Sequence, residues 1–226
     1  MIIAIDGPSG VGKSTVAKAV AKKLHFSCLD TGAMYRCIAV YAQQNDIAFT
    51  DEEALTKIAE EKQISFGHTP GNPIPTEVFI DGQNVTDAIR TGEIDKAVSP
   101  VSAVAGVRSA LTVQQQRIGN SGNYVVEGRD IGTVVFPEAE VKIFLSASDK
   151  ERAHRRLRQN VDRGFGSIEF DEIFQSLVAR DKCDSTREIA PLVAAQDAFT
   201  LDSTNMYIEE VINKICDLAS SIHSGE

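Results

Sequence analysis

Residues 7–14 read Gly7-Pro8-Ser9-Gly10-Val11-Gly12-Lys13-Ser14 and match the pattern G-x-x-x-x-G-K-[ST] in full. An apolar run of strand length precedes the motif at residues 1–5, and residues 16–24 follow with apolar side chains at helical spacing. Glycines in such a loop let several backbone N–H groups and the helix N-terminus point at one anion. The motif, in this strand–loop–helix context, predicts a binding site for a nucleoside triphosphate.

Two side chains at the end of the motif supply the phosphate and metal chemistry. Lys13 can reach the β and γ phosphates, and the hydroxyl of Ser14 can bind Mg²⁺. A glycine-rich turn that ends in Lys-Ser by chance is the weaker alternative, because it leaves the flanking strand and helix unexplained. We therefore expect nucleotide contacts from the whole loop and the residue after it, namely Gly7, Pro8, Ser9, Gly10, Val11, Gly12, Lys13, Ser14 and Thr15.

Composition restricts the partners of this chain. Its 226 residues, 42% of them hydrophobic, suffice for one α/β domain with an excursion or for two small lobes. A formal net charge of −9 argues against a nucleic-acid polymer or an anionic membrane as partner. Ten of the twelve arginines nevertheless lie at or after Arg108, which indicates use at chosen sites.

Targeting signals and metal motifs are lacking in the sequence pattern. The first strand leaves no room for a signal peptide, no apolar run has membrane-spanning length, and the four cysteines show no C-x-x-C spacing. We expect a cytoplasmic protein with free thiols, and Mg²⁺ as its only metal. A monomer is the simplest expectation, although no pattern in the sequence determines the oligomeric state.

The order of apolar runs predicts the fold. Strand-like runs occupy residues 2–6, 26–29, 124–126, 141–145 and 198–201, and helical stretches separate most of them. Two of the helices are predicted to begin with capping boxes, at residues 50–53 and 148–151, and the last helix should run from about residue 206 to 222. We expect an α/β fold with a doubly wound, five-stranded parallel sheet.

One segment departs from this alternation. Residues 64–86 contain three prolines and then the pair Asp81-Gly82 between short apolar runs. An Asp-Gly pair in that setting is a hairpin signal. A small antiparallel hairpin insert is therefore favoured over a long structureless loop, which compact domains seldom contain.

The class of phosphate-loop protein depends on what faces the loop. The chain lacks D-x-x-G and N-K-x-D, which a GTPase uses to sense the γ phosphate and to read guanine. A small-molecule kinase needs a second anion site, and residues 30–36 and 127–132 follow the second and third strands with Arg36 and Arg129. Either arginine alone would more often form a surface ion pair. Together, just after strands, they favour a kinase.

Several long motifs, in order, now resemble bacterial cytidylate kinases. They are residues 6–13 (DGPSGVGK), 30–36 (DTGAMYR), 127–137 (EGRDIGTVVFP), 152–156 (RAHRR) and 190–192 (APL). The resemblance covers nearly the whole chain and implies transfer of the γ-phosphoryl group of ATP to CMP or dCMP. It also implies a core (1–35, 105–148, 168–226), a lobe for the nucleoside monophosphate that contains the hairpin insert (36–104), and a helical lid (149–167).

The resemblance assigns roles to matching positions. Arg36, Arg129 and Arg187 would hold the CMP phosphate; Ser99, Arg108 and Asp130 would read cytosine; Arg180 and Asp184 would bind the ribose; Thr31 would join the acceptor site; Arg155 and Arg156 would contact the transferring phosphate and ATP. Lys13, Arg129, Arg155 and Arg187 would thus be the catalytic group. A carboxylate suits the N4 amine of cytosine and would face O4 of uracil as acceptor against acceptor. Arg158 is interpreted as a solvated residue.

The expected chemistry needs no general base. The attacking group is a phosphate oxygen that is mostly dianionic at neutral pH, since the second pKa of a phosphate monoester is about 6. Glu127 could order Mg²⁺ through water or could merely cap a loop, and the two readings are equally favoured. Two rivals remain: a kinase for another acceptor such as UMP, AMP or shikimate, and a nucleotide-gated binding module that turns ATP over slowly.

Overall fold

The computed structural model describes residues 1–164 and 166–223. The chain forms two compact units, one built from Met1–Leu29 with the chain from Gly122 onward, and one from Asp30–Ser121. The first unit contains the phosphate loop, and the second contains the insert. Within the described residues, no helix has both the length and the apolar character needed to cross a bilayer.

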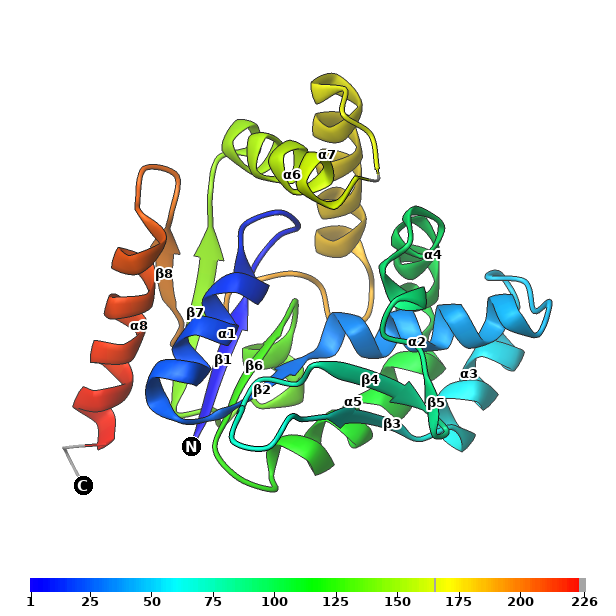
Figure 1. Ribbon diagram of the computed structural model, residues 1–226, viewed down its shortest axis with the longest axis horizontal. Helices are drawn as coiled ribbons and strands as arrows, with labels where there is room; N and C mark the ends of the chain where they lie inside the picture. The colour runs from blue at the N-terminus through cyan, green and yellow to red at the C-terminus, as the bar shows by residue number, and fades with distance from the viewer. Residues whose placement is uncertain (165, 224–226) are drawn as a thin grey trace. The chain divides into compact units, whose positions relative to one another are not determined.

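A five-stranded sheet forms the centre of the first unit (Figure 1). Its strands lie in the order β2 (Ser27–Asp30), β6 (Tyr124–Gly128), β1 (Ile2–Asp6), β7 (Val141–Ser146) and β8 (Phe199–Asp202). β1 pairs in parallel with β6 and β7, and β7 pairs in parallel with β8. The chain passes from central β1 to edge strand β2 before β6 fills the gap, so the expected doubly wound parallel sheet is confirmed.

Strand β1 is buried along its whole length, which explains its unbroken apolar run. Helix α1 (Lys13–Leu24) follows the loop and buries Val16, Ala17, Val20 and Ala21, the helical stripe expected from the sequence. Helix α8 (Ile208–His223) packs against α1 and lies beside β7 and β8 in Figure 1. A short π-helical turn, η2 (Ile131–Val135), follows β6. These elements bring the ends of β1 and β6 to one edge of the sheet.

Two long helices of the same unit pack against each other. Helix α6 (Asp149–Arg163) and helix α7 (Phe170–Thr186) share a small apolar cluster centred on Ala153, Ile173 and Leu177 (Figure 1). Of the capping box predicted at the start of α6, half forms: the Ser148 hydroxyl accepts the Glu151 N–H at 3.3 Å. The Ser148 N–H donates instead to Thr204 Oγ1 at 2.9 Å, and the Glu151 carboxylate accepts from Arg155.

The second unit combines helices with a small sheet. Its elements are α2 (Thr31–Gln44), α3 (Glu52–Glu61), β3 (Ile64–Gly67), β4 (Glu77–Ile80), β5 (Gln83–Asn84), η1 (Ala88–Arg90), α4 (Gly92–Ala103) and α5 (Ala105–Gly119). The capping box predicted with Thr50 at its head is wrong, because Asp51 is the N-cap of α3 and accepts the Ala54 N–H at 3.0 Å. A carboxylate in that position can satisfy the same orphan amide.

The insert forms as an antiparallel structure of three strands in the order β3–β4–β5. Asp81 and Gly82 have φ angles of 51° and 78° and connect β4 to β5, the two positive angles that a type I′ turn demands. The hairpin predicted from the Asp-Gly pair is thus confirmed. Strand β3, from the run before the prolines, adds a third strand to it.

Helix α5 belongs to the second unit, whereas the sequence placed residues 105–148 with the core. α5 packs closely on α3: a Cβ atom added at Gly106 would collide with the side chain of Thr56. The second unit therefore extends to Ser121, beyond the lobe boundary at residue 104. The expected lid, residues 149–167, covers α6 and the turn after it, and residue 165 within that range lies outside the described residues.

Candidate active site

The loop between β1 and α1 follows a backbone path that glycine can adopt and that would strain other residues. Gly7, Gly10 and Gly12 have φ angles of 152°, 74° and 100°, a region that side-chain-bearing residues rarely adopt. A Cβ atom at Gly7 would also overlap the backbone carbonyl of Leu145 in β7. Helix α1 begins at Lys13, so its N-terminal N–H groups and positive dipole end lie at the loop, as an anion site requires.

Cationic side chains hold the carbonyl groups of this loop. Lys13 Nζ donates to the carbonyl oxygens of Gly7 and Pro8, both at 2.8 Å. From α6, Arg152 Nη1 donates to the Ser9 carbonyl at 2.8 Å, and Arg155 Nη1 donates to the Val11 carbonyl at 3.0 Å. Four loop carbonyls are therefore fixed by charge-assisted hydrogen bonds, which preset the curl of the backbone.

Lys13 lies where several charged groups converge. The Lys13 side chain is buried, and burial, followed by the nearby Arg129 and Arg180, lowers its pKa well below the usual value, while Glu127 and Asp6 act in the opposite direction. Three cations from β1–α1, the end of β6 and α7 thus repel one another at this point. A polyanion bound here would relieve that repulsion.

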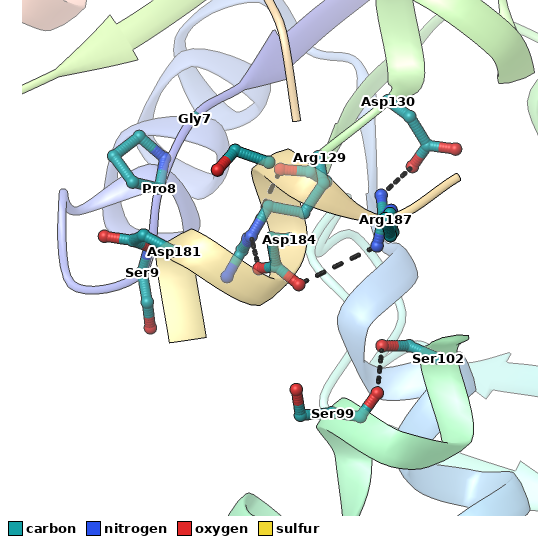
Figure 2. Close-up of polar contacts among 12 residues, drawn as sticks. Gly7, Pro8, Ser9, Ser99, Ser102, Arg129, Asp130, Asp181, Asp184 and Arg187 are labelled. Atoms are coloured by element: carbon teal, nitrogen blue, oxygen red, sulfur yellow. Dashed lines mark hydrogen bonds and ion pairs between the residues drawn. The ribbon is translucent and has the colours of Figure 1, made fainter. Parts of the chain in front are cut away.

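Four of the residues assigned to the acceptor nucleotide form one alternating chain of charges (Figure 2). Arg129 Nε donates to Asp184 Oδ2 at 3.0 Å. Arg187 lies between two carboxylates, with Nη1 at 3.7 Å from Asp184 Oδ1 and Nη2 at 3.8 Å from Asp130 Oδ1. We call Arg129, Asp130, Asp184 and Arg187 the acceptor network. Their side chains are largely buried, so these guanidinium groups are not scattered over the surface.

Asp6 anchors the turn that carries part of this network, and sequence reasoning gave it no role. Its two carboxylate oxygens accept the N–H groups of Ile131 and Gly132, at 2.8 and 2.7 Å. Burial raises the pKa of Asp6 to about 6, against the lowering effect of these two hydrogen bonds. The sequence signal for this role is an acidic residue at the end of an otherwise apolar strand, Ile2–Asp6.

The motif after the third strand begins inside that strand. Glu127 and Gly128 are the last two residues of β6, and Arg129 is the first residue beyond it. Glu127 is buried opposite Ile5 of β1 in the strand register. Ser14 is exposed in the first turn of α1. A hydroxyl with a buried carboxylate in the same unit fits the oxygen ligands that Mg²⁺ takes alongside water and phosphate. In residues 1–164 and 166–223, no group of three or more His, Cys, Asp or Glu side chains could hold a metal ion.

The second unit holds the remaining acceptor candidates on α2, α4 and α5. Thr31 starts α2, whose N-cap Asp30 accepts the Ala33 N–H at 3.0 Å. Arg36, one turn further, pairs with Asp95 of α4 at 2.6 Å between Nη2 and Oδ1. The first turns of α2 therefore carry both residues, and Asp95 is a partner of Arg36 that the sequence gave no reason to select.

The two predicted base readers of this unit are linked. Arg108 is buried, stacks over the ring of Tyr35 at 5.3 Å from its centroid, and donates through Nη1 to the Ser102 carbonyl at 3.0 Å. The Ser102 hydroxyl in turn donates to the Ser99 carbonyl at 3.0 Å (Figure 2). Ser102 thus joins Ser99 to Arg108, a role that sequence spacing did not reveal.

The arginines of α6 differ in their surroundings. Besides its bond to Val11, Arg155 donates to Glu151 and to the hydroxyl and carbonyl of Ser203. Arg156 donates to Gln159 one turn ahead, and Arg158 is exposed beside Glu151, as the sequence suggested. Arg152, which received no role from the sequence, is the most deeply buried of the four and contacts the phosphate loop.

A parallel sheet whose central strand ends in a glycine-rich anion loop, with a buried lysine surrounded by arginines, defines a phosphate-loop kinase. The family model described as cytidylate kinase matches residues 3–221, and the chain belongs to this family. It is an ATP-dependent phosphotransferase, a nucleoside monophosphate kinase that acts on CMP.

Individual relatives agree with the family match. The cytidylate kinase of Carboxydothermus hydrogenoformans is 46% identical, with 96% of each chain covered, and that of Bacillus subtilis is 46% identical over 95% of this chain and 94% of that protein. A bifunctional pantoate ligase/cytidylate kinase of Prochlorococcus marinus is 49% identical over 96% of this chain and 44% of its own length. A solved structure of an uncharacterized Eubacterium ventriosum protein shares the fold, with a TM-score of 0.51, 11% identity, and 98% and 99% of the two chains covered.

Proposed function

We propose that the protein transfers the γ-phosphoryl group of ATP to CMP or dCMP with the help of Mg²⁺, giving ADP and CDP or dCDP. The observation that carries the proposal is the convergence of Arg129 and Arg180 on the buried Lys13, beside the acceptor network. Such a cluster of cations suits two phosphate groups that must approach each other. The expected monomeric state and cytoplasmic location stay predictions.

On the ATP side, the loop residues 7–15 surround the phosphates and bind them through backbone N–H groups, except at Pro8, which has no N–H, and at Ser9, whose N–H donates to Asp181. Lys13 exchanges its bonds to Gly7 and Pro8 for the β and γ phosphate oxygens. Ser14 would hold Mg²⁺, with Glu127 reaching it through water, and the ion would neutralise charge between the β and γ phosphates. We assign Arg156 to the ATP phosphates on the family resemblance.

On the acceptor side, Arg129 and Arg187 grip the phosphate of CMP. Both now pair with Asp184, and a phosphate that takes over these guanidinium donors frees Asp184 to accept from the ribose hydroxyls. Asp130 accepts from the N4 amine of cytosine. The family resemblance assigns Arg180 to the ribose, and Thr31, Arg36, Ser99 and Arg108 of the second unit to the same nucleotide.

The reaction needs placement rather than a base. The CMP phosphate is mostly dianionic at pH 7 and attacks the γ phosphorus directly, since its second pKa is about 6. Lys13, Arg129 and Arg187 offset the charge that spreads over the transferring group. Arg155 already donates to Glu151, Val11 and Ser203, so its contact with that group requires it to exchange one of these partners.

A coupled assay of ADP release with CMP, dCMP, UMP and AMP tests the proposal. We expect CMP and dCMP to stimulate ADP release strongly and UMP and AMP to stimulate it weakly. Equal stimulation by UMP or AMP would assign the protein to another acceptor. ATP turnover that none of the four stimulates would favour the nucleotide-gated binding module.

A further inference from the structure

Both backbone polar groups of Ser9, near the tip of the phosphate loop, are held by side chains that also bind each other. The Ser9 N–H donates to Asp181 Oδ1 at 3.0 Å, and the Ser9 carbonyl accepts from Arg152 Nη1 at 2.8 Å. The same Nη1 atom donates to Asp181 Oδ2. Ser9, Arg152 and Asp181 thus close a three-membered ring of hydrogen bonds, and Figure 2 shows Asp181 of α7 beside Ser9.

This ring is protected from water. The side chains of Arg152 and Asp181 are 4% and 17% exposed. The next loop residue, Gly10, packs closely on both helices: a Cβ atom there would lie 3.2 Å from the Arg152 carbonyl and 3.5 Å from Leu177 Cδ1. The first half of the loop therefore rests directly on α6 and α7. Removing one partner of a buried, hydrogen-bonded ion pair is costly, because the other charge stays buried.

The direction of the Ser9 amide matters for an anion loop. Its N–H points to a carboxylate of α7, while the Ser9 carbonyl points to a guanidinium group of α6. The Ser9 N–H belongs to the Pro8–Ser9 peptide and the Ser9 carbonyl to the Ser9–Gly10 peptide, so both peptide planes that flank Ser9 are held, and with them the backbone that leads into Gly10, Val11 and Gly12. Asp181 binds Ser9 through Oδ1 and Arg152 through Oδ2, so one carboxylate bridges the loop and α6.

We propose that Asp181 is a positioning residue that holds the phosphate loop in its ATP-binding shape by bridging Ser9 and Arg152. The inference rests on the proposed function, because it concerns the ATP subsite of that same reaction. Asp181 does not touch the reacting atoms in this mechanism. It acts through the loop backbone.

The acceptor subsite should not depend on this bridge. Asp184 lies on the same helix, one turn after Asp181, and binds Arg129 and Arg187. The carboxylate of this helix that pairs with both arginines of the acceptor network is thus Asp184, whereas Asp181 binds Ser9 and Arg152. Loss of the Asp181 carboxylate should therefore weaken ATP binding and leave CMP binding unchanged.

Arg152 offers a matched control. A second carboxylate, Asp149, accepts from Arg152 Nη2 at 2.6 Å, but it is 54% exposed. Asp149→Asn removes a negative charge from the same guanidinium group and leaves the Ser9 bridge in place. Asp181→Asn removes one charge as well, and its amide can satisfy either Ser9 or Arg152 but must turn its NH₂ group toward the other donor.

The experiment measures dissociation constants of Mg·ATP and of CMP separately, by calorimetry, for the wild type, Asp181→Asn and Asp149→Asn. We expect Asp181→Asn to weaken ATP binding about tenfold or more, as the loss of a buried charged hydrogen bond implies. CMP binding by this variant, and both affinities of Asp149→Asn, should stay within about twofold of the wild type. In steady-state assays, the KM for ATP should rise in Asp181→Asn while the KM for CMP does not.

Three results would overturn the proposal: unchanged ATP affinity in Asp181→Asn, an equal loss in Asp149→Asn, or an equal loss of CMP affinity. If Asp181→Asn does not fold, hydrogen exchange of the wild-type Ser9 amide decides, because a bridged N–H is protected and an unprotected one refutes the bridge. A wild-type protein that binds ATP but phosphorylates no nucleotide would refute the proposed function alone, since ATP binding is measured directly.

Discussion

Asp6 should make the protein less stable as pH rises through the weakly acidic range. Asp6 is 5% exposed, and burial raises the pKa of its carboxyl group from 3.8 to about 6. The N–H groups of Gly132 and Ile131 and the charge of Lys13 favour the ionised form, while Asp130 disfavours it. Burial outweighs the groups that favour ionisation, so the native state holds the proton more tightly than the unfolded chain does.

The magnitude follows from the difference between the two pKa values. A shift from 3.8 to about 6 corresponds to about 3 kcal/mol of unfolding free energy, at about 1.4 kcal/mol per pKa unit. The sign is fixed because the folded pKa is the higher one. The contribution is fully present below about pH 3.8 and is lost as pH rises through about 6.

Urea unfolding of the wild type and of Asp6→Asn, from about pH 3.5 to 8, isolates this contribution. The difference between the two unfolding free energies cancels groups that titrate identically in both proteins. The unfolding free energy of the wild type minus that of Asp6→Asn should fall by about 3 kcal/mol between the acid and the alkaline end of this pH range. A difference that stays flat, or that rises with pH, would refute the reasoning.

Glu140 provides a control, because it binds the first residue of β1, the strand that ends at Asp6. Its carboxylate accepts the Ile2 N–H at 2.7 Å. Although burial acts to raise its pKa, the Ile2 hydrogen bond and the nearby amino group of Met1 outweigh burial and lower it. The difference between wild type and Glu140→Gln should therefore have the opposite sign of slope, with stability gained as pH rises out of the acid range.

Three further predictions concern the site and the thiols. Lys13→Ala and Arg129→Ala should each lower the rate of CMP-dependent ADP release by about a hundredfold or more with unchanged circular dichroism, and near-wild-type turnover in either would remove it from catalysis. Asp130→Ala should reduce the ratio of kcat/KM for CMP over UMP, and an unchanged ratio would exclude Asp130 from base reading. In native protein one thiol, the exposed Cys183, should react rapidly with Ellman's reagent; rapid reaction of Cys37, whose pKa burial raises to about 12, would contradict the structure.

The features that the sequence predicted are those with a local pattern. The loop at residues 7–14, the five strands and the Asp81-Gly82 turn each depend on a few consecutive residues, and the structure places them as expected. The end of β6 was placed two residues too early, because Glu127 and Gly128 do not read as apolar strand residues. Glu127 and Gly128 extend the strand because they pair with Ile5 and Asp6 of β1, a contact that their own polarity does not indicate.

Caps and partners were harder because tertiary contacts decide them. Thr50 and Asp51 both qualify as N-caps by sequence, and only the backbone path selects Asp51. The Ser148 N–H donates to Thr204, 56 residues away, and not to the nearby Glu151. The assignment of α5 likewise depends on its close packing with α3, which residue spacing does not encode.

Two carboxylates, Asp6 beside the phosphate loop and Asp181 on α7, explain why the sequence could locate the loop but not the contacts that hold the site together. Asp6 precedes Gly7 and holds the turn after β6 through two N–H groups, 125 and 126 residues away. Asp181 holds Ser9 from 172 residues away. Both accept backbone N–H groups in buried surroundings, where an orphaned donor is costly, so each fixes a peptide plane without contacting a nucleotide. A glycine-rich loop is flexible by composition, and in this protein the loop backbone is held by Asp181 together with Lys13, Arg152 and Arg155.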